Sequence, residues 1–124
     1  MEKVSTNKAP KAIGPYSQAI KSGSFVFTSG QIPIDATSGE IVGSNIVEQA
    51  TQVLKNLSEV LIEAGSSLDR IVKTTCFLAD MGDFAKFNEV YSSFIKNAPA
   101  RSCVAVKTLP KNVLCEVEAI AEIK

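Results

Sequence analysis

The sequence predicts an α+β fold, a two-layer sandwich in which two helices cover one face of a single mixed sheet. Three observations predict it: two segments with helical periodicity, branched and aromatic stretches around them, and turn-forming residues between the outer strands. The expected order is ββαβαββ. With 124 residues the chain has the length of one domain, and we assign residues 1–124 to it.

The clearest helix is expected over residues 45–64. Its apolar residues recur at steps of three and four, which places them on one helical face. These residues are Ile46, Val47, Ala50, Val53, Leu54, Leu57, Val60, Leu61 and Ala64. Asn45 can cap the first turn with Glu48, and Gly65 can end the helix in a left-handed conformation.

A strand and a second helix follow. Residues 71–78, IVKTTCFL, are rich in β-branched and aromatic side chains and predict a strand. Residues 83–94 predict a helix, with Asp80 or Asp83 available near its start. One stripe of this helix contains Phe84, Phe87, Asn88, Tyr91 and Phe94.

The outer strands are predicted around two turns. Residues 17–21 and 25–29 flank Ser-Gly-Ser, and residues 101–107 and 113–122 flank Leu-Pro-Lys-Asn. If the second pair formed a symmetric hairpin, Arg101 would face Ile120, with Glu116 roughly 13 Å further along the strand.

The last strand has one uniformly apolar row and one mixed row. Cys115, Val117, Ala119 and Ala121 form the first row, and the second row mixes three carboxylates with Leu114 and Ile120. We expect the mixed row to face a symmetric interface between copies of the chain.

Composition excludes several classes of function. Thirteen basic and thirteen acidic residues cancel, so no overall field attracts nucleic acid or anionic lipid. Because the chain has no histidine, it has no imidazole that could act as a general base and none that could bind a metal ion. The three separated cysteines predict free thiols, and we expect neither metal nor cofactor. The absence of a signal-peptide core or a membrane-length apolar run predicts a cytoplasmic protein.

Arg101 is the first candidate for chemistry. It starts an otherwise apolar strand and shares a face with Cys103. The guanidinium fork fits a carboxylate, such as that of a small 2-oxo or 2-imino acid. The alternatives are an internal salt bridge and a surface side chain. For Cys103, the alternative is a small buried apolar residue.

Other candidates are weaker. Glu116 and Glu118 share a strand face and could divide acid and base duties, or could be surface charges. Tyr16 follows Gly-Pro and could be aimed at a ligand or packed in the core. Ser29 and Gly30 end a strand, where either a ligand approaches the backbone or the strand bulges.

Asn88 interrupts an aromatic helical stripe. A satisfied core amide and a ligand contact are both consistent with it.

Together these segments resemble the RidA/YjgF family of reactive-intermediate deaminases, over about residues 7–121. The quoted motifs are NKAPKAIGPYSQAI, FTSGQIPID, IVKTTCFLADMGDF, FNEVY, PARSCVAV and LPKNVLCEVEAIA, in the expected order. The resemblance implies a chorismate mutase-like fold and a homotrimer with sites between chains. It implies cofactor-free hydrolysis of 2-iminobutanoate and 2-iminopropanoate, which pyridoxal-phosphate dehydratases release, to 2-oxo acids and ammonia.

The resemblance also implies roles for residues. Arg101 is expected to clamp the carboxylate, and Glu116 to orient the attacking water. Cys103 is expected to offer its backbone amide without acting as a nucleophile. The positions expected to shape the pocket are Tyr16, Ser29, Gly30 and Asn88. The segment before Pro99 is shorter than the family pattern, and Ala98 replaces a common aromatic residue.

Two other functions compete with the deaminase. One is a regulatory module that binds a small carboxylate without turnover. The other is an endoribonuclease, an activity that the resemblance also implies. Zero net charge and the lack of histidine argue against RNA cleavage.

Overall fold

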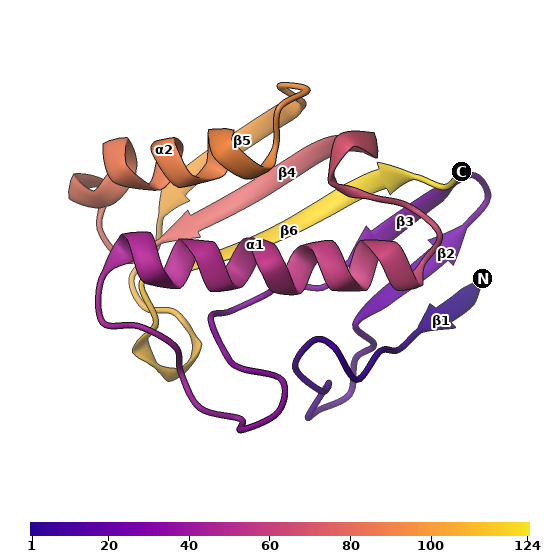
Figure 1. The fold of residues 1–124 in the computed structure, drawn as a ribbon, viewed down its shortest axis with the longest axis horizontal. Helices are drawn as coiled ribbons and strands as arrows, with labels where there is room; N and C mark the ends of the chain where they lie inside the picture. Colours follow the sequence, from indigo (N-terminus) through magenta and orange to yellow (C-terminus); the bar gives the residue numbers. More distant parts are fainter.

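A six-stranded sheet and two α-helices make up the computed structural model, which describes residues 1–124 (Figure 1). The strands are β1 Glu2–Val4, β2 Ala19–Ser22, β3 Phe25–Thr28, β4 Ile71–Leu78, β5 Ala100–Ala105 and β6 Cys115–Glu122. The helices are α1 Ile46–Glu63 and α2 Phe84–Phe94. The predicted α+β class with helices on one face of a mixed sheet is confirmed.

The spatial order of the strands is β1-β2-β3-β6-β4-β5. All neighbours are antiparallel except β4 and β5, which are parallel. A parallel pair needs a long crossover, and α2 provides it. β5 is therefore a free edge that lies under α2 (Figure 1).

Two expectations about the strands require correction. The short first strand was not predicted, because three residues carry too little alternation to be recognised. The conditional hairpin between the last two strands is wrong, because β4 lies between β5 and β6. The Leu-Pro-Lys-Asn segment instead forms a 3₁₀ turn with left-handed Lys111 and Asn112, and it carries the chain past β4.

Both predicted ends of α1 are confirmed. The Asn45 side chain accepts a hydrogen bond from the Glu48 amide at 2.9 Å, and Glu48 Oε1 accepts one from the Ser44 amide at 3.0 Å. Gly65 follows the helix with φ of 83°, a conformation that glycine adopts without strain.

The start of α2 is built in two steps. The Asp80 carboxylate accepts a hydrogen bond from the Gly82 amide at 2.8 Å and so begins a 3₁₀ turn, Met81–Asp83, that leads into the helix. Asp83 makes no capping hydrogen bond through its side chain. Phe87 lies in the core, with its ring 5.9 Å from that of Tyr91.

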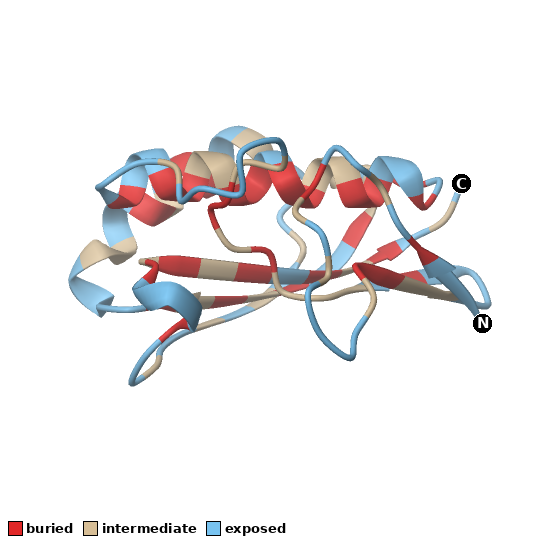
Figure 2. Cartoon of the chain, turned by 90° about the horizontal axis from the view of Figure 1, so that it is seen from below, coloured by how far each residue is buried: buried red, intermediate tan, exposed pale blue.

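The core fills the space between the helix layer and the sheet, and the other sheet face is open (Figure 2). The predicted alternation of β6 is confirmed, since Cys115, Val117, Ala119 and Ala121 are buried. On the open face, Phe27 and Val104 are 44% and 46% exposed. Neither helix combines the length and the apolar character needed to cross a membrane.

Candidate functional site

Arg101 lies on the helix-covered face of the edge strand β5. Its direct partner across the ladder is Thr74 of β4, which is fully buried under the helices. From this position Nη1 donates a hydrogen bond to Oδ1 of Asn88 on α2 at 2.8 Å. The guanidinium carbon lies 4.8 Å from the ring centroid of Tyr91 and 5.5 Å from that of Phe84. Two aromatic rings and one amide therefore fix the guanidinium.

No carboxylate neutralises this guanidinium within the chain. The only ion pair of the structure joins Lys21 to Glu2, which rules out an internal salt bridge for Arg101. Arg101 is half-buried and opens on a cavity of about 340 Å³. The residues that line the cavity are Asn88, Tyr91, Ser92, Ile95, Ala98, Pro99 and Arg101. A half-buried fork of donors facing a cavity is suited to bind an anion.

Cys103 shares this face with Arg101, as the strand alternation predicted. It lies directly opposite Cys76 across the ladder, and all three cysteines are free. Burial raises the pKa of the Cys103 thiol, although the nearby Arg101 charge works in the opposite direction. Burial also raises the pKa of Cys76 to about 12. Both side chains are therefore neutral thiols, which are poor nucleophiles.

Glu116 lies on the opposite face of the sheet. Its ladder partner is Phe77 of β4, which in turn pairs with the exposed Val104 of β5. Burial raises the pKa of the half-buried Glu116 carboxyl, and the charge of Glu118 raises it further. A carboxyl with a raised pKa is a better proton acceptor than an ordinary one.

Gly30 packs against Glu116 and explains why no side chain is present there. A methyl group at this position would lie 2.7 Å from Cδ and 2.9 Å from Cγ of Glu116. The bulge, one of the alternatives for this position, is present: three residues, from Thr28 to Gly30, oppose two residues of β6 between the Phe27–Ile120 and Gln31–Val117 pairs. The bulge brings the backbone close to the carboxylate.

Ser29 holds the bulge to the preceding strand. Its hydroxyl donates to the carbonyl of Ser17 at 2.5 Å, and its amide donates to the carbonyl of Gln18 at 2.9 Å. Ser29 therefore ties Gly30 to the segment that carries Tyr16.

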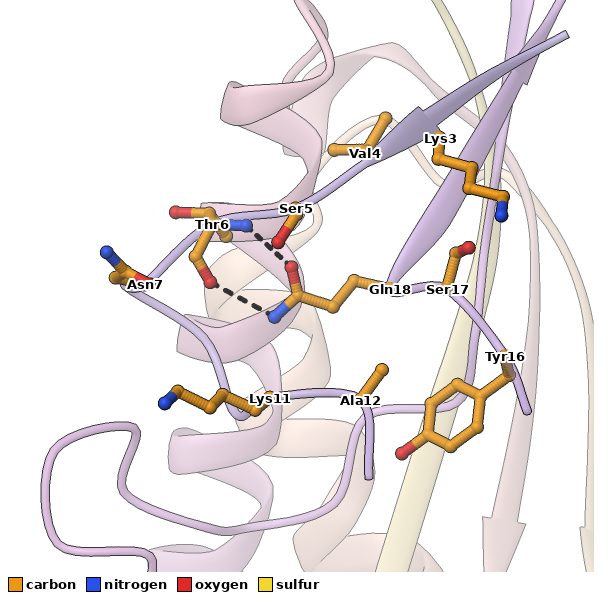
Figure 3. A pocket seen from close by; sticks show the side chains of 10 residues that line it. All are labelled: Lys3, Val4, Ser5, Thr6, Asn7, Lys11, Ala12, Tyr16, Ser17 and Gln18. Atoms are coloured by element: carbon orange, nitrogen blue, oxygen red, sulfur yellow. Dashed lines mark hydrogen bonds between the residues drawn. The ribbon is translucent and has the colours of Figure 1, made fainter. Parts of the chain in front are cut away.

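Tyr16 is 52% exposed, so the core-packing alternative is wrong. It lines a cavity of about 360 Å³ beside Lys3, Lys11 and Gln18 (Figure 3). It also lines a second cavity, of about 290 Å³, that reaches Gly30. Tyr16 and Gly30 therefore face a common space.

Gln18 was not anticipated as a residue that shapes the site. Its buried amide accepts from the Thr6 amide at 2.7 Å and donates to the Pro10 carbonyl at 2.7 Å, which secures the loop before Tyr16. The stacking of Tyr91 and Phe84 on Arg101 was also missed, because a helical aromatic stripe indicates only a core face. No group of three or more acidic or cysteine side chains is arranged to hold a metal ion.

The predicted residues form two groups rather than one. Arg101 and Cys103 lie on the helix-covered face of the sheet, close to Asn88 of α2, whereas Glu116 and Gly30, with Ser29 and Tyr16 nearby, lie at the start of β6. The ladder positions of Arg101 and Glu116 differ by three residues along the strand direction and by two strands across the sheet, which places their backbones about 14 Å apart. Their side chains leave opposite faces of the sheet. One chain does not bring the two groups together.

Comparisons with known proteins identify the family. The family model described as Endoribonuclease L-PSP matches residues 6–123. The chain belongs to this family, the RidA/YjgF family. The resemblance seen in the sequence motifs is thereby confirmed.

Members of the RidA/YjgF family match over nearly their whole length. A RutC family protein of Pyrococcus abyssi is 56% identical over 121 residues, which is 97% of this chain and 95% of that protein. The mouse 2-iminobutanoate/2-iminopropanoate deaminase is 47% identical over 119 residues, covering 95% of this chain and 88% of the deaminase. The structure of Escherichia coli TdcF with bound serine superimposes with a TM-score of 0.95 at 44% identity and covers 100% of both chains.

Proposed function

We propose that this RidA/YjgF protein hydrolyses small 2-imino acids, such as 2-iminobutanoate and 2-iminopropanoate, to 2-oxo acids and ammonia. The observation that carries the proposal is the Arg101 guanidinium, which is half-buried, faces a cavity and has no carboxylate partner. An ionised carboxylate supplies the missing charge and can accept two parallel hydrogen bonds from the fork. The mouse deaminase of the same family supports the substrate class.

The reaction mainly requires that the imino acid and one water molecule be held in the correct relative position. Water adds to the electrophilic imine carbon, the carbinolamine that forms transfers a proton to nitrogen, and ammonia leaves as the carbonyl forms. Glu116, whose pKa is raised by burial, accepts the proton from water and returns it to the leaving nitrogen. Arg101 holds the acid so that the imine carbon meets this water. No step needs an imidazole or a covalent intermediate.

The complete site requires two chains in this proposal. Because Arg101 and Glu116 leave opposite faces of the sheet, one chain supplies the carboxylate clamp and its neighbour supplies the base. A homotrimer with three such clefts satisfies this requirement. The open sheet face, with Phe27, Val104 and the half-buried Ile120, supports assembly because it presents apolar surface that a neighbour would cover.

Coupling the protein to a threonine dehydratase tests the activity. The dehydratase releases the imine, whose decay can be followed by trapping it or by its absorbance. We expect wild-type protein to accelerate the decay and Arg101→Ala to lose most of that effect. Absence of acceleration by the wild type, or full acceleration by Arg101→Ala, would exclude the proposal.

A second candidate is a module that binds small carboxylates without turnover. The bound serine in the TdcF structure favours it, because serine is a free amino acid with a carboxylate. Thermal stabilisation of this protein by 2-oxobutanoate without any acceleration of imine decay would select this candidate over the enzyme.

A further inference from the structure

We propose that Tyr91 and Thr74 are positioning residues that hold the Arg101 guanidinium ready to bind a carboxylate. The inference deepens the proposed function and rests on it, because it assigns the carboxylate preference of the site to a pair of residues behind Arg101. Neither residue was a candidate from the sequence, where Tyr91 belonged to a core stripe and Thr74 to the interior of a strand.

The three residues form a closed loop of contacts. Thr74 is the ladder partner of Arg101, so the two side chains leave neighbouring strands on the same face. The Thr74 hydroxyl and the Tyr91 hydroxyl are 2.7 Å apart and share a hydrogen bond. The Tyr91 ring returns to Arg101, with the guanidinium carbon 4.8 Å from its centroid. The hydrogen bond therefore fixes the ring on which the cation is stacked.

Packing alone does not account for this pair. Thr74 is 0% exposed and Tyr91 is 7% exposed, and both belong to a region that apolar side chains could fill. A buried hydroxyl is unfavourable unless it finds a partner, whereas valine and phenylalanine would have none to satisfy. On the same helix, Phe87 fills its part of the core without a hydroxyl. The hydrogen-bonded hydroxyls of Thr74 and Tyr91 therefore have a role beside the Arg101 cavity other than filling the core.

The remaining contacts of Arg101 complete the restraint. Phe84 approaches the guanidinium at 5.5 Å, and Asn88 accepts the hydrogen bond from Nη1. An unrestrained arginine loses considerable side-chain freedom when it binds a ligand. Because the contacts already restrict the Arg101 side chain, it loses less conformational entropy on binding, which increases its affinity for the carboxylate. A neutral ligand that does not use the guanidinium gains nothing from the restraint.

Paired ligands measure this effect. The dissociation constants of 2-oxobutanoate and of its uncharged amide are determined by calorimetry for the wild type and for Tyr91→Leu, Tyr91→Phe and Thr74→Val. Loss of the ring in Tyr91→Leu is expected to weaken binding of the acid roughly tenfold, which is the range of a partly desolvated cation–π contact. Because Tyr91 also lines the cavity, binding of the amide is expected to weaken less, so that the preference for acid over amide falls. Tyr91→Phe and Thr74→Val are expected to weaken the acid about two- to fivefold.

The double variant Tyr91→Phe/Thr74→Val adds a test of the hydrogen bond. Since both partners of one bond are removed, its effect on the acid is expected to match a single variant rather than the product of two. Phe94→Leu is the matched control, because Phe94 is an aromatic residue of α2 that packs against the core but forms no ring pair with Tyr91 and no cation–π contact with Arg101. It is expected to lower thermal stability without changing the preference for acid over amide.

The outcomes separate this inference from the proposed function. An unchanged acid-to-amide preference in Tyr91→Leu, or in Tyr91→Phe and Thr74→Val if Tyr91→Leu does not fold, would overturn the positioning role even if the protein deaminates imines. A preference lost in the variants of a protein that shows no turnover would support the positioning role and overturn the deaminase. A wild type that binds acid and amide equally would overturn the positioning role.

Discussion

Arg101 and Glu116 leave opposite faces of one sheet, because Arg101 pairs with the buried Thr74 whereas Glu116 pairs with Phe77 on the open face. A clamp and a base that act on the same small molecule must lie within a few ångströms of it. In this chain they are separated by the sheet itself, so the proposed function requires a second copy of the chain.

Mixing two inactive variants tests this dependence. Arg101→Ala keeps Glu116, and Glu116→Gln keeps Arg101, so mixed assemblies contain clefts in which both intact residues meet. With random assembly from equal amounts, about one quarter of the clefts are intact, and about one quarter of wild-type activity is expected after denaturation and joint refolding. Each variant refolded alone is the control. No recovery from the mixture would argue against a site shared by two chains.

The shape of the cation matters as much as its charge. Arg101→Lys keeps the charge but loses the fork, the stacking surface and the bond to Asn88, so we expect kcat/KM for the imine to fall about ten- to a hundredfold. Arg70 is the only other arginine and donates to the carbonyls of Glu122 and Ile123, which makes Arg70→Lys a matched control. An Arg101→Lys protein as active as the control would contradict the clamp.

The pH dependence of activity is expected to follow Glu116. Because burial and Glu118 raise its pKa, kcat/KM should fall on acidification at a pH above the ordinary glutamate value of 4.5. Glu118→Gln removes one cause of the rise, so it should move this acid limb to lower pH. Glu116→Gln should lower activity and abolish the limb. An unchanged limb in both variants would assign it to another group.

Stability should show the same ionisation with a defined sign. The folded state holds the Glu116 proton more tightly than the unfolded state, so the free energy of unfolding contributed by this group falls as pH rises through its folded pKa. We expect Glu116→Gln to have a higher melting temperature than wild type near neutral pH. The difference should disappear well below pH 4.5, and its persistence there would indicate a cause other than charge.

Gly30 is expected to be essential for activity rather than for folding. In Gly30→Ala the new methyl group would overlap the Glu116 side chain, which would have to move away from the position that the proposed mechanism requires. We expect kcat to fall at least tenfold with a small change in melting temperature. Gly82→Ala, at a glycine without a positive φ and outside both groups of site residues, controls for a general effect of the substitution. Near-normal kcat in Gly30→Ala would show that the Glu116 position is not critical.

Thiol reactivity offers an independent measure of the Arg101 cavity. Burial raises the pKa values of Cys76 and Cys115 to about 12, so neither should react with a disulfide reagent in the native protein. Cys103 is half-buried and should react slowly, giving at most one thiol before and three after denaturation. Two fast native thiols would contradict this environment.

Features with local causes were predictable from the sequence. The ends of α1 follow from Asn45, Glu48 and Gly65, which act within a few residues of one another. The bounds of β4 follow from its β-branched and aromatic composition, and the common face of Arg101 and Cys103 follows from alternation along a strand. These properties depend on neighbours in the chain and not on tertiary pairing.

The arrangement of the site was not predictable in the same way. The position of β4 between β5 and β6 depends on the crossover through α2, and no local signal specifies that order. Without the strand order, the sequence does not determine whether Arg101 and Glu116 lie on the same face of the sheet. The contact between Tyr91 and Arg101 depends on the same packing of α2 over the edge strand.

The parallel pairing of β4 and β5 also has a consequence for how such sites diversify. Everything that restrains Arg101, namely Thr74, Phe84, Asn88 and Tyr91, comes from the continuous segment 71–105. The residues around Arg101 can therefore vary together within one continuous stretch of chain, whereas Glu116 and Gly30 lie outside that stretch.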